Sequence, residues 1–457
     1  MTYIEFFDKV PTENIVACLT YAPDRVILIG DSSKLMEAHI KRYNRIFKDR
    51  GKTIEFLCET VPQNALDKAV AKLSEIVETY SINEQDTCVF DVTGGNELLL
   101  VALGVVCTRY PEQNIQIHRF NLRNNIITDC DKDGVTIYRD APTLSVEENV
   151  RLYGGDVVYG TICEEDKTYR WDLNETFERD LRHMWEISKR GFGNWNSEIG
   201  VLKMIDSKGS ASADGLTVTA DIDVVDWELR QNKRTMSYAT LDTDNSGKRD
   251  TILRSLKRYG LITRFEETAD KKVIVSFKDE QVKACLTEEG QVLELMVYLT
   301  AKAVKGKDGN EVYNSSLTGV QIDWDGDPHG TLYEQLEKAP KSEDNRIPDV
   351  VYDTENEVDV LLMHKTVPIF VSCKNGDVKS EELYKLRTVA ERFGGPYAKA
   401  VLVATSIPVL MKRDKTDRGH AGEYLRQRAK DMGIRLIENF DPDSKETERV
   451  LSTLWEG

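Results

Sequence analysis

Apolar strand patterns and amphipathic helix patterns alternate through the first 145 residues. Residues 25–30, Arg-Val-Ile-Leu-Ile-Gly, form an uninterrupted apolar run, and residues 65–80 place their large apolar side chains on one helical stripe. A second apolar run, 87–92, leads through a Gly-Gly turn into a helical pattern over 97–110. Parallel strands need crossover helices between them, so this alternation predicts a parallel sheet with helices on both faces. We therefore expect an α/β, Rossmann-like domain over residues 1–145.

Three loops at the carboxyl ends of these predicted strands carry glycines and small polar residues. Ligands of open α/β sheets bind at this edge, where glycine lets the backbone approach closely and a helix start offers N–H groups to a phosphate. The loops contain neither the Gly-Lys-Ser/Thr of a P-loop nor G-x-G-x-x-G. The alternative, that Gly94-Gly95 only makes a tight turn, stays open. The candidate ligand-binding residues are Pro11, Thr12, Asn14, Gly30, Asp31, Ser32, Thr93, Gly94, Gly95 and Asn96.

Residues 146–282 have a mixed pattern and form the predicted middle region. A helical pattern over 247–259 is followed by Gly-Leu-Ile, a charged turn and a strand over 273–277. Helix followed by hairpin is the order of a winged-helix unit, so we expect a mixed α+β segment of that kind. A spacer that carries dimer contacts explains the same pattern, and we favour it over nucleic-acid reading.

Residues 283–457 predict a second α/β domain, which contains a hairpin with chemistry-bearing residues. The hairpin pairs strands over 357–363 and 368–374. If the turn is Lys365-Thr366, Asp359 lies opposite Ser372, and alternation places Lys374 on the same face.

A helix upstream, predicted over 287–304, is apolar on nearly every side and carries one acid, Glu294. Burying a carboxylate there is costly without a cation. The alternative is that Glu294 lies on a single solvent-exposed strip of the helix. Glu294 and Asp359 can hold Mg²⁺ or Mn²⁺ through oxygen ligands, and Lys374 can offset developing negative charge. Asp349 after Pro348 is a competing ligand, less favoured because it precedes the strand. We interpret the acidic cluster of Asp323, Asp325 and Asp327 as a charged turn rather than as metal ligands.

Composition narrows the possible partners. The net charge of −17 argues against a uniformly basic nucleic-acid-coating surface. A local basic patch is the candidate substrate contact, with a solvated helix face as the alternative. No apolar run reaches the about 20 residues of a membrane span, and the N-terminus has no signal-peptide pattern. Eight scattered cysteines predict a cytoplasmic protein with reduced thiols. The patch comprises Lys399, Lys412, Arg413, Lys415, Arg418, Arg426, Arg428 and Lys430.

Four segments together resemble a known family, the CRISPR-associated ancillary nucleases that join a CARF domain to a PD-(D/E)XK nuclease domain. They are residues 91–97 (Asp-Val-Thr-Gly-Gly-Asn-Glu), 290–294 (Gly-Gln-Val-Leu-Glu), 356–360 (Asn-Glu-Val-Asp-Val) and 371–376 (Val-Ser-Cys-Lys-Asn-Gly). The resemblance implies a CARF domain, a restriction-endonuclease-like C-terminal domain and a cytoplasmic homodimer. It also implies that a cyclic oligoadenylate, most often cyclic tetra-adenylate, is made by a type III CRISPR complex during phage infection and activates cleavage of DNA or RNA.

The resemblance assigns catalytic roles to Glu294, Asp359 and Lys374, with Mn²⁺ or Mg²⁺ as the cofactor. Ser372 stands where the superfamily pattern has an acid, which leaves the number of metals open. A further metal ligand would be the Cys373 carbonyl, or Glu381 or Glu382. Two alternatives remain: a ligand-sensing regulator whose nuclease-like domain is inert, and an enzyme that degrades its cyclic ligand.

Overall fold

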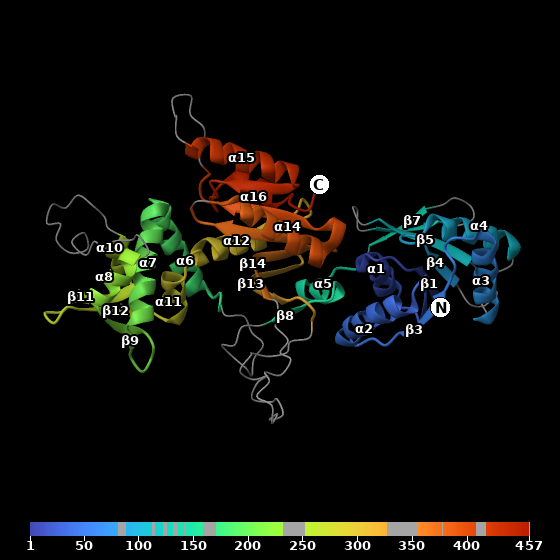
Figure 1. The fold of residues 1–457 in the computed structure, drawn as a ribbon, viewed down its shortest axis with the longest axis horizontal. Coiled ribbons are helices and arrows are strands. Elements are labelled where there is room, and N and C mark those ends of the chain that lie inside the picture. The colour runs from blue at the N-terminus through green and yellow to red at the C-terminus, as the bar shows by residue number, and fades with distance from the viewer. Residues whose placement is uncertain are drawn as a thin grey trace, which may run out of the picture.

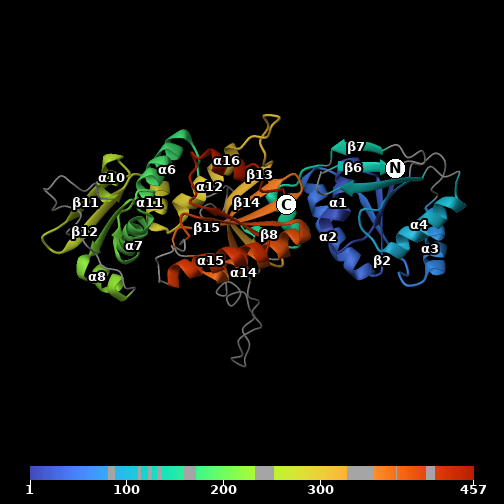
Figure 2. The same ribbon diagram turned by 90° about the horizontal axis from the view of Figure 1, so that it is seen from above.

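The computed structural model describes most of the chain as three bodies in a row along its longest axis (Figures 1 and 2). The N-terminal domain and the larger part of the middle region lie at opposite ends, with the C-terminal sheet between them. The described residues are 1–80, 88–111, 115–121, 126–130, 136–140, 142–158, 171–231, 252–326, 355–376, 378–407 and 417–456.

The N-terminal domain is a seven-stranded sheet in the order β3-β2-β1-β4-β5-β6-β7. Strands β1 to β5 are parallel, and β6 and β7 are antiparallel additions at one edge. The strands are β1 (Thr2–Phe6), β2 (Arg25–Gly30), β3 (Glu55–Thr60), β4 (Cys88–Asp91), β5 (Ile115–Asn121), β6 (Ile126–Cys130) and β7 (Thr136–Asp140). Helices α1 (Pro11–Tyr21) and α2 (Ser33–Asp49) cover one face; α3 (Leu66–Thr79) and α4 (Glu97–Arg109) cover the other. Both sheet faces are therefore buried, as the alternating pattern predicts.

The first part of the middle region is joined to the C-terminal sheet. After α5 (Val146–Leu152), strand β8 (Asp156–Val158) pairs antiparallel with β13 (Ser315–Asp323) of that sheet. The remainder forms a four-stranded sheet in the order β11-β12-β10-β9 with packed helices. Its elements are α6 (Glu175–Ser188), α7 (Phe192–Lys208), β9 (Ser210–Ala211), β10 (Thr217–Asp221), α8 (Ile222–Gln231), α10 (Ile252–Arg258), β11 (Ile262–Glu267), β12 (Lys272–Phe277) and α11 (Glu280–Thr287).

The C-terminal domain is a six-stranded sheet in the order β17-β16-β15-β14-β13-β8. Its helix α12 (Gln291–Ala303) and α6 of the middle region share a core with one sheet face, while α14 and α15 pack with the other. From Val360 to Met363, successive side chains on β14 alternate between these two cores, as a strand requires. The remaining elements are β14 (Glu355–His364), β15 (Val367–Lys374), α14 (Ser380–Gly394), η1 (Gly395–Tyr397), β16 (Lys399–Ala404), α15 (Asp417–Asp431), β17 (Ile434–Glu438) and α16 (Lys445–Leu451).

One helix differs from the sequence-based prediction. The helix predicted over 287–304 is interrupted: α11 ends at Thr287, and α12 begins at Gln291. Gly290 has φ 98°, a left-handed conformation that breaks the helix at little steric cost.

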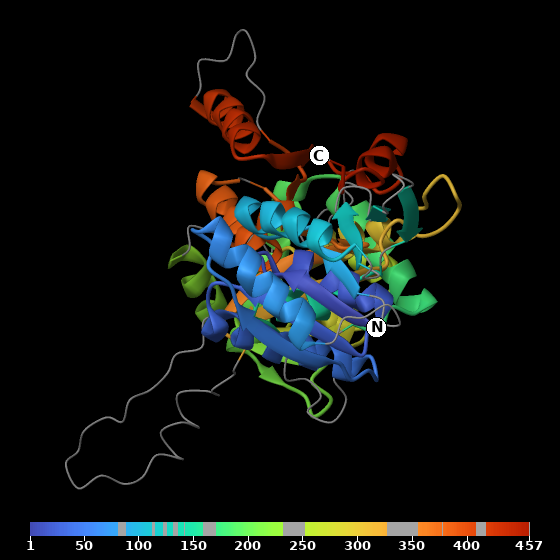
Figure 3. The ribbon, with the colours of Figure 1, turned by 90° about the vertical axis from the view of Figure 1, so that its right-hand side faces the viewer.

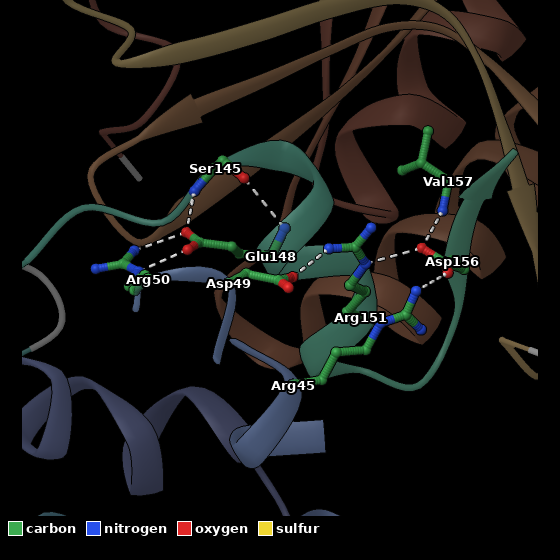
Figure 4. A network of polar contacts seen from close by, with 8 residues as sticks. All are labelled: Arg45, Asp49, Arg50, Ser145, Glu148, Arg151, Asp156 and Val157. Carbon is green, nitrogen blue, oxygen red and sulfur yellow. Dashed lines mark hydrogen bonds and ion pairs between the residues drawn. The ribbon is translucent and has the colours of Figure 1, made fainter. Parts of the chain in front are cut away.

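Charged side chains hold the end of α2 against α5 and β8 (Figure 4). The Arg50 guanidinium donates a hydrogen bond to each carboxylate oxygen of Glu148, both at 2.6 Å, and so forms a bidentate salt bridge. Arg151 contacts Asp49 at 2.8 Å and Asp156 at 2.9 Å. Figure 3 looks along the long axis with the N-terminal domain nearest the viewer. The salt bridges of Arg50 and Arg151 hold the N-terminal domain against α5 and β8, which lie beside the C-terminal sheet.

Candidate functional site

The β14–β15 hairpin brings Asp359 and Ser372 together. Val360 pairs with Val371, and His364 with Val367, so Lys365-Thr366 is the turn. Asp359 and Ser372 stand next to the Val360–Val371 pair, so the same register, continued by one residue, sets them opposite each other. The Ser372 hydroxyl donates to Asp359 Oδ2 at 3.2 Å, and the backbone N–H of Cys373 donates to the same oxygen at 2.5 Å. The register expected from the sequence is therefore confirmed.

Lys374 lies between two carboxylates. Its Nζ is 4.0 Å from Asp359 Oδ2 and 3.4 Å from Glu382 Oε2 on the first turn of α14. Together these residues face a cavity of about 100 Å³ beside the hairpin. The cavity is lined by Asn356, Glu357, Val358, Asp359, Val371, Ser372, Lys374, Glu382, Lys385, Leu386 and Val389.

Burial and the neighbouring charges set the protonation behaviour of this group. Burial raises the pKa of Asp359, against the opposing effects of Lys374 and the two hydrogen bonds. For Lys374, burial acts to lower the pKa, but the carboxylates of Asp359 and Glu382 outweigh it, and the net pKa is raised. Burial opposes ionisation of Glu382 too, yet Lys374 and Lys385 lower its pKa overall. Both shifts favour a charged Lys374–Glu382 pair.

Glu294 lies apart from this cavity but within its electrostatic field. The residue is 8% exposed on α12, and its Oε2 accepts a hydrogen bond from Gln291 Nε2 at 3.0 Å. Burial raises its pKa well above the ordinary value, and the charge of Asp359 adds to the effect, opposed by Lys374. Glu294 does not line the cavity. The structure thus brings three predicted residues together and leaves the fourth close enough to interact through charge.

Cys373 points its thiol away from the cavity. Its side chain is buried in the core shared with α12, and burial raises the pKa of the thiol well above its usual range. The predicted metal contact through its carbonyl stays a prediction. Asp323 is buried and pairs across the sheet with Glu355, four positions along β14 from Asp359. Asp325 is exposed on the turn after β13, whereas Asp327 and Asp349 lie outside the described residues.

The described ranges contain no group of three or more His, Cys, Asp or Glu side chains placed to share an ion. The donors that are present nevertheless suit a hard divalent cation, because Asp359 and Glu382 offer carboxylate oxygens to one cavity. Burial raises the pKa values of Asp359 and Glu294, so an added positive charge would favour their ionised forms. The donor set therefore fits Mg²⁺ or Mn²⁺.

The three candidate ligand-binding loops converge at one edge of the N-terminal sheet. A Cβ on Gly94 would lie 2.8 Å from the Cβ of Asp8, so the loops after β4 and β1 touch. A Cβ on Gly30 would lie 3.3 Å from Phe7, which brings in the loop after β2. Gly95 has φ 96°, a conformation that L side chains rarely adopt. The backbone of this edge is therefore shaped by glycine, as the sequence predicts.

Several polar side chains predicted at this edge already have protein partners. Asn14 accepts from the Asp8 backbone N–H and donates to Tyr43, and Thr93 bonds to Asp91. Ser32 and Asn96 cap the starts of α2 and α4. Pro11 is buried at the start of α1, and Asp31 is exposed on its loop. These hydrogen bonds hold the loops in shape, with Gly30 and Gly94 buried among them.

Two tyrosines that the sequence analysis did not select join this edge to the middle region and to the C-terminal domain. The Thr12 and Tyr153 hydroxyls are hydrogen-bonded at 3.2 Å, and the Tyr397 hydroxyl donates to the Glu13 carboxylate. Both bonds reach the first turn of α1. Tyr397 lies in η1, directly after α14. The Gly-Gly-Pro turn before it was the available sequence signal.

Part of the predicted basic patch is neutralised. Arg426 forms a salt bridge with Glu438 at 2.7 Å and another with Glu423 at 2.9 Å. The Arg428 guanidinium lies over the rings of Tyr384 and Tyr424, at 5.4 and 4.6 Å from their centroids. Lys412, Arg413 and Lys415 lie outside the described residues, and so does the side chain of Arg418. The patch as predicted from the sequence stays a prediction.

Comparison with known proteins shows the fold. No family model matches the sequence, and no curated protein is significantly similar to it. Protein VC1899 from Vibrio cholerae shares 15% identity with a TM-score of 0.64, covering 100% of this chain and 98% of that one. Can2 from Sulfobacillus thermosulfidooxidans, solved with cyclic tetra-adenylate, shares 15% identity with a TM-score of 0.58, covering 100% and 99%. The α/β fold class predicted from the sequence is confirmed, and the resemblance is confirmed as a likeness of fold.

No helix in the described part of the chain is both long enough and apolar enough to cross a bilayer.

Proposed function

We propose that this protein is a metal-dependent endonuclease of type III CRISPR antiviral defence, activated by a cyclic oligoadenylate. The proposal includes cyclic tetra-adenylate as the preferred activator and DNA, RNA or both as the substrate. The carrying observation is the cluster of Asp359, Ser372 and Lys374 at the edge of a cavity, with Glu294 in its electrostatic field. The full-length fold shared with Can2, which was solved with cyclic tetra-adenylate, supports the activator.

In this proposal Asp359 and Glu294 hold Mn²⁺ or Mg²⁺, together with the Cys373 carbonyl. When bound, the ion polarises a phosphate and makes a water molecule more acidic. Asp359 is oriented for this role by hydrogen bonds from Ser372 and from the Cys373 backbone. Lys374 brings positive charge to the same cavity, where it stabilises the negative charge that develops on a phosphate during cleavage.

The activator would bind at the glycine-shaped edge of the N-terminal sheet, in a homodimer. Helix α4, which starts at this edge, has an exposed apolar stripe that includes Leu100, Val101 and Gly104. Leu100 and Val101 are 36% and 55% exposed, unusually high for aliphatic side chains on one helix face. In this proposal α4 of a second protomer packs against the apolar stripe. Two-fold pairing there would place the ligand-binding edges of both protomers side by side, around a symmetric cyclic ligand.

Coupling between the two sites would run through α1 and α14. The start of α1 carries Thr12 and Glu13, which contact Tyr153 and Tyr397. Tyr397 follows the C-terminal end of α14, and Glu382 stands in the first turn of the same helix. A ligand that favours one position of α1 therefore biases a helix whose first turn lies beside Lys374.

A cleavage assay tests the proposal. Purified protein is incubated with plasmid DNA and labelled RNA in Mn²⁺, with and without cyclic tetra-adenylate, beside Asp359→Ala and Lys374→Ala. We expect ligand-dependent cleavage that both substitutions abolish. Cleavage that persists in both variants would rule out this site.

A second candidate function is a ligand-sensing regulator with an inactive nuclease-like domain. It is favoured by Ser372, which provides no carboxylate at its position on β15. In that case both nucleic acids stay intact in the assay, and the ligand changes only DNA retention.

A further inference from the structure

Lys374 stands at the end of β15, past the part of that strand whose backbone pairs with β14. The backbone pairing of β15 with β14 runs from Val367 to Val371, whereas its pairing with β16 continues to Lys374. Beyond Val371, the Cys373 backbone N–H donates to the side chain of Asp359. The position of Lys374 therefore depends on contacts other than a sheet ladder on both sides.

Asn375, the residue after Lys374, makes hydrogen bonds at three points. Its backbone carbonyl accepts from Asn196 Nδ2 at 2.6 Å, and its own Nδ2 donates to Asn196 Oδ1 at 2.8 Å. Its Oδ1 accepts from the Thr405 hydroxyl, which follows β16, at 2.9 Å. Because a backbone carbonyl can only accept, the contacts are mutually consistent: each amide presents its donor to an acceptor.

The partner of Asn375 comes from the middle region. Asn196 lies on α7, 179 positions earlier in the chain. The neighbouring Trp195 is buried in the same core as Cys373 of β15. A Cβ on Gly376 would lie 3.4 Å from Asn196 Nδ2, and a glycine at φ 122° lets the chain turn directly after this contact. Helix α7 therefore packs against the end of the strand that carries Lys374.

We propose that Asn196 is a positioning residue for the candidate active site, through which α7 holds the end of β15 and keeps Lys374 in the cavity. This role rests on the proposed nuclease function and gives the middle region a part in it. Asn196 is not among the described residues that line the cavity, so it acts through Asn375. The Lys374 ammonium lies 4.0 Å from Asp359, and misplacement of a catalytic group by about 1 Å can cost about 100-fold in rate.

The experiment compares the cleavage kinetics of full-length Asn196→Ala and Asn194→Ala with those of the unmodified protein, in Mn²⁺ and saturating cyclic tetra-adenylate. Asn194 is the matched control, because it is an exposed asparagine on the same helix. We expect Asn196→Ala to lower kcat about tenfold or more and to leave KM within about twofold, since positioning acts on the chemical step. Asn194→Ala should leave both constants unchanged. Thermal denaturation checks that each variant is folded.

Thr405→Val tests the same contact from within the C-terminal domain and decides the question if Asn196→Ala does not fold. It removes the hydroxyl that donates to Asn375 and keeps a side chain of similar shape at this buried position. We expect kcat to fall about threefold or more, again with little change in KM. Because both residues act through Asn375, the combined variant should lose less than the product of the two single losses.

The lysine itself provides a readout that needs no cleavage. Lysines labelled with ¹³C by reductive methylation give NMR signals, and the signal that disappears in Lys374→Arg belongs to Lys374. Asn196→Ala should shift this signal, because the ammonium moves relative to the carboxylates of Asp359 and Glu382. Asn194→Ala should leave it in place.

The possible results separate the positioning role from the nuclease function. If the unmodified protein cleaves, and Asn196→Ala keeps both its kcat and its Lys374 signal, the role of Asn196 is refuted and the nuclease assignment stands. If the unmodified protein does not cleave but Asn196→Ala shifts the signal, the nuclease assignment is refuted and the positioning of Lys374 by α7 stands. Without cleavage and without a shift, both are refuted. A rise in KM alone, or equal losses in Asn194→Ala, would also refute the positioning role.

Discussion

The hydroxyl groups of Tyr153 and Tyr397 are the most direct test of communication between the ligand edge of the N-terminal domain and the cavity of the C-terminal domain. Tyr397→Phe removes a hydrogen bond to the Glu13 carboxylate, and Tyr153→Phe removes one to Thr12. Bonds to charged groups contribute more than neutral ones, but Glu13 and Tyr397 are partly exposed, so we assign about 1–2 kcal/mol to the first bond and about 1 kcal/mol to the second. Because every 1.4 kcal/mol is tenfold, the double variant should lose about 30- to 150-fold of coupling between ligand and catalysis.

The assay compares cleavage rates with and without saturating cyclic tetra-adenylate, beside ligand binding measured separately by calorimetry. We expect the ratio of the two rates to approach one in the double variant while ligand still binds. Tyr384→Phe is the matched control, since Tyr384 is an exposed tyrosine on the surface of α14 whose hydroxyl contacts Arg428. An unchanged rate ratio in the double variant would refute the route through α1.

Three further predictions concern pH, backbone strain and assembly. Burial, with a contribution from Arg42, lowers the pKa of His39 to about 4. Because the imidazole of the unfolded chain takes up its proton near pH 6.5, the folding stability is full above that pH and falls by up to about 3 kcal/mol as pH decreases towards 4. Denaturant titration should find a smaller decrease in His39→Gln. Gly95→Ala, at φ 96° and with its new Cβ 2.6 Å from another Cβ, should cost about 1–3 kcal/mol in thermal unfolding, whereas Gly193→Ala, which meets open space in a helix, should cost nothing. Val101→Lys should convert the proposed dimer to monomer in light-scattering measurements, and Val224→Lys, on α8 and 46% exposed, should not.

Local patterns in the sequence predicted the fold and part of the candidate site. The position of Asp359 opposite Ser372 follows from side-chain alternation and a two-residue turn, both of which are set within sixteen residues of chain. The convergence of the three ligand-edge loops follows similarly from the rule that parallel strands end at the same edge of a sheet. Both predictions needed only period and turn geometry.

The features that escaped prediction depend on how distant elements pack. Glu13 and Tyr397 are separated by 384 positions, and neither residue type marks the contact in advance. The approach of Glu382 to Lys374 depends on how α14 is rotated over the sheet, which helical periodicity leaves open. The separation of Glu294 from the cavity likewise depends on the position where Gly290 lets α12 begin.

The short strand β8 has a practical meaning for anyone who wishes to isolate the C-terminal domain. Its three residues cap the outer side of β13, although they precede that strand by more than 150 positions. A protein fragment that starts at residue 283 would present β13 with bare amide and carbonyl groups, a template for sheet-to-sheet self-association. A fragment that starts near residue 142 would retain this protective edge only by also carrying the middle region, so proteolysis should release the N-terminal domain more cleanly than the other two.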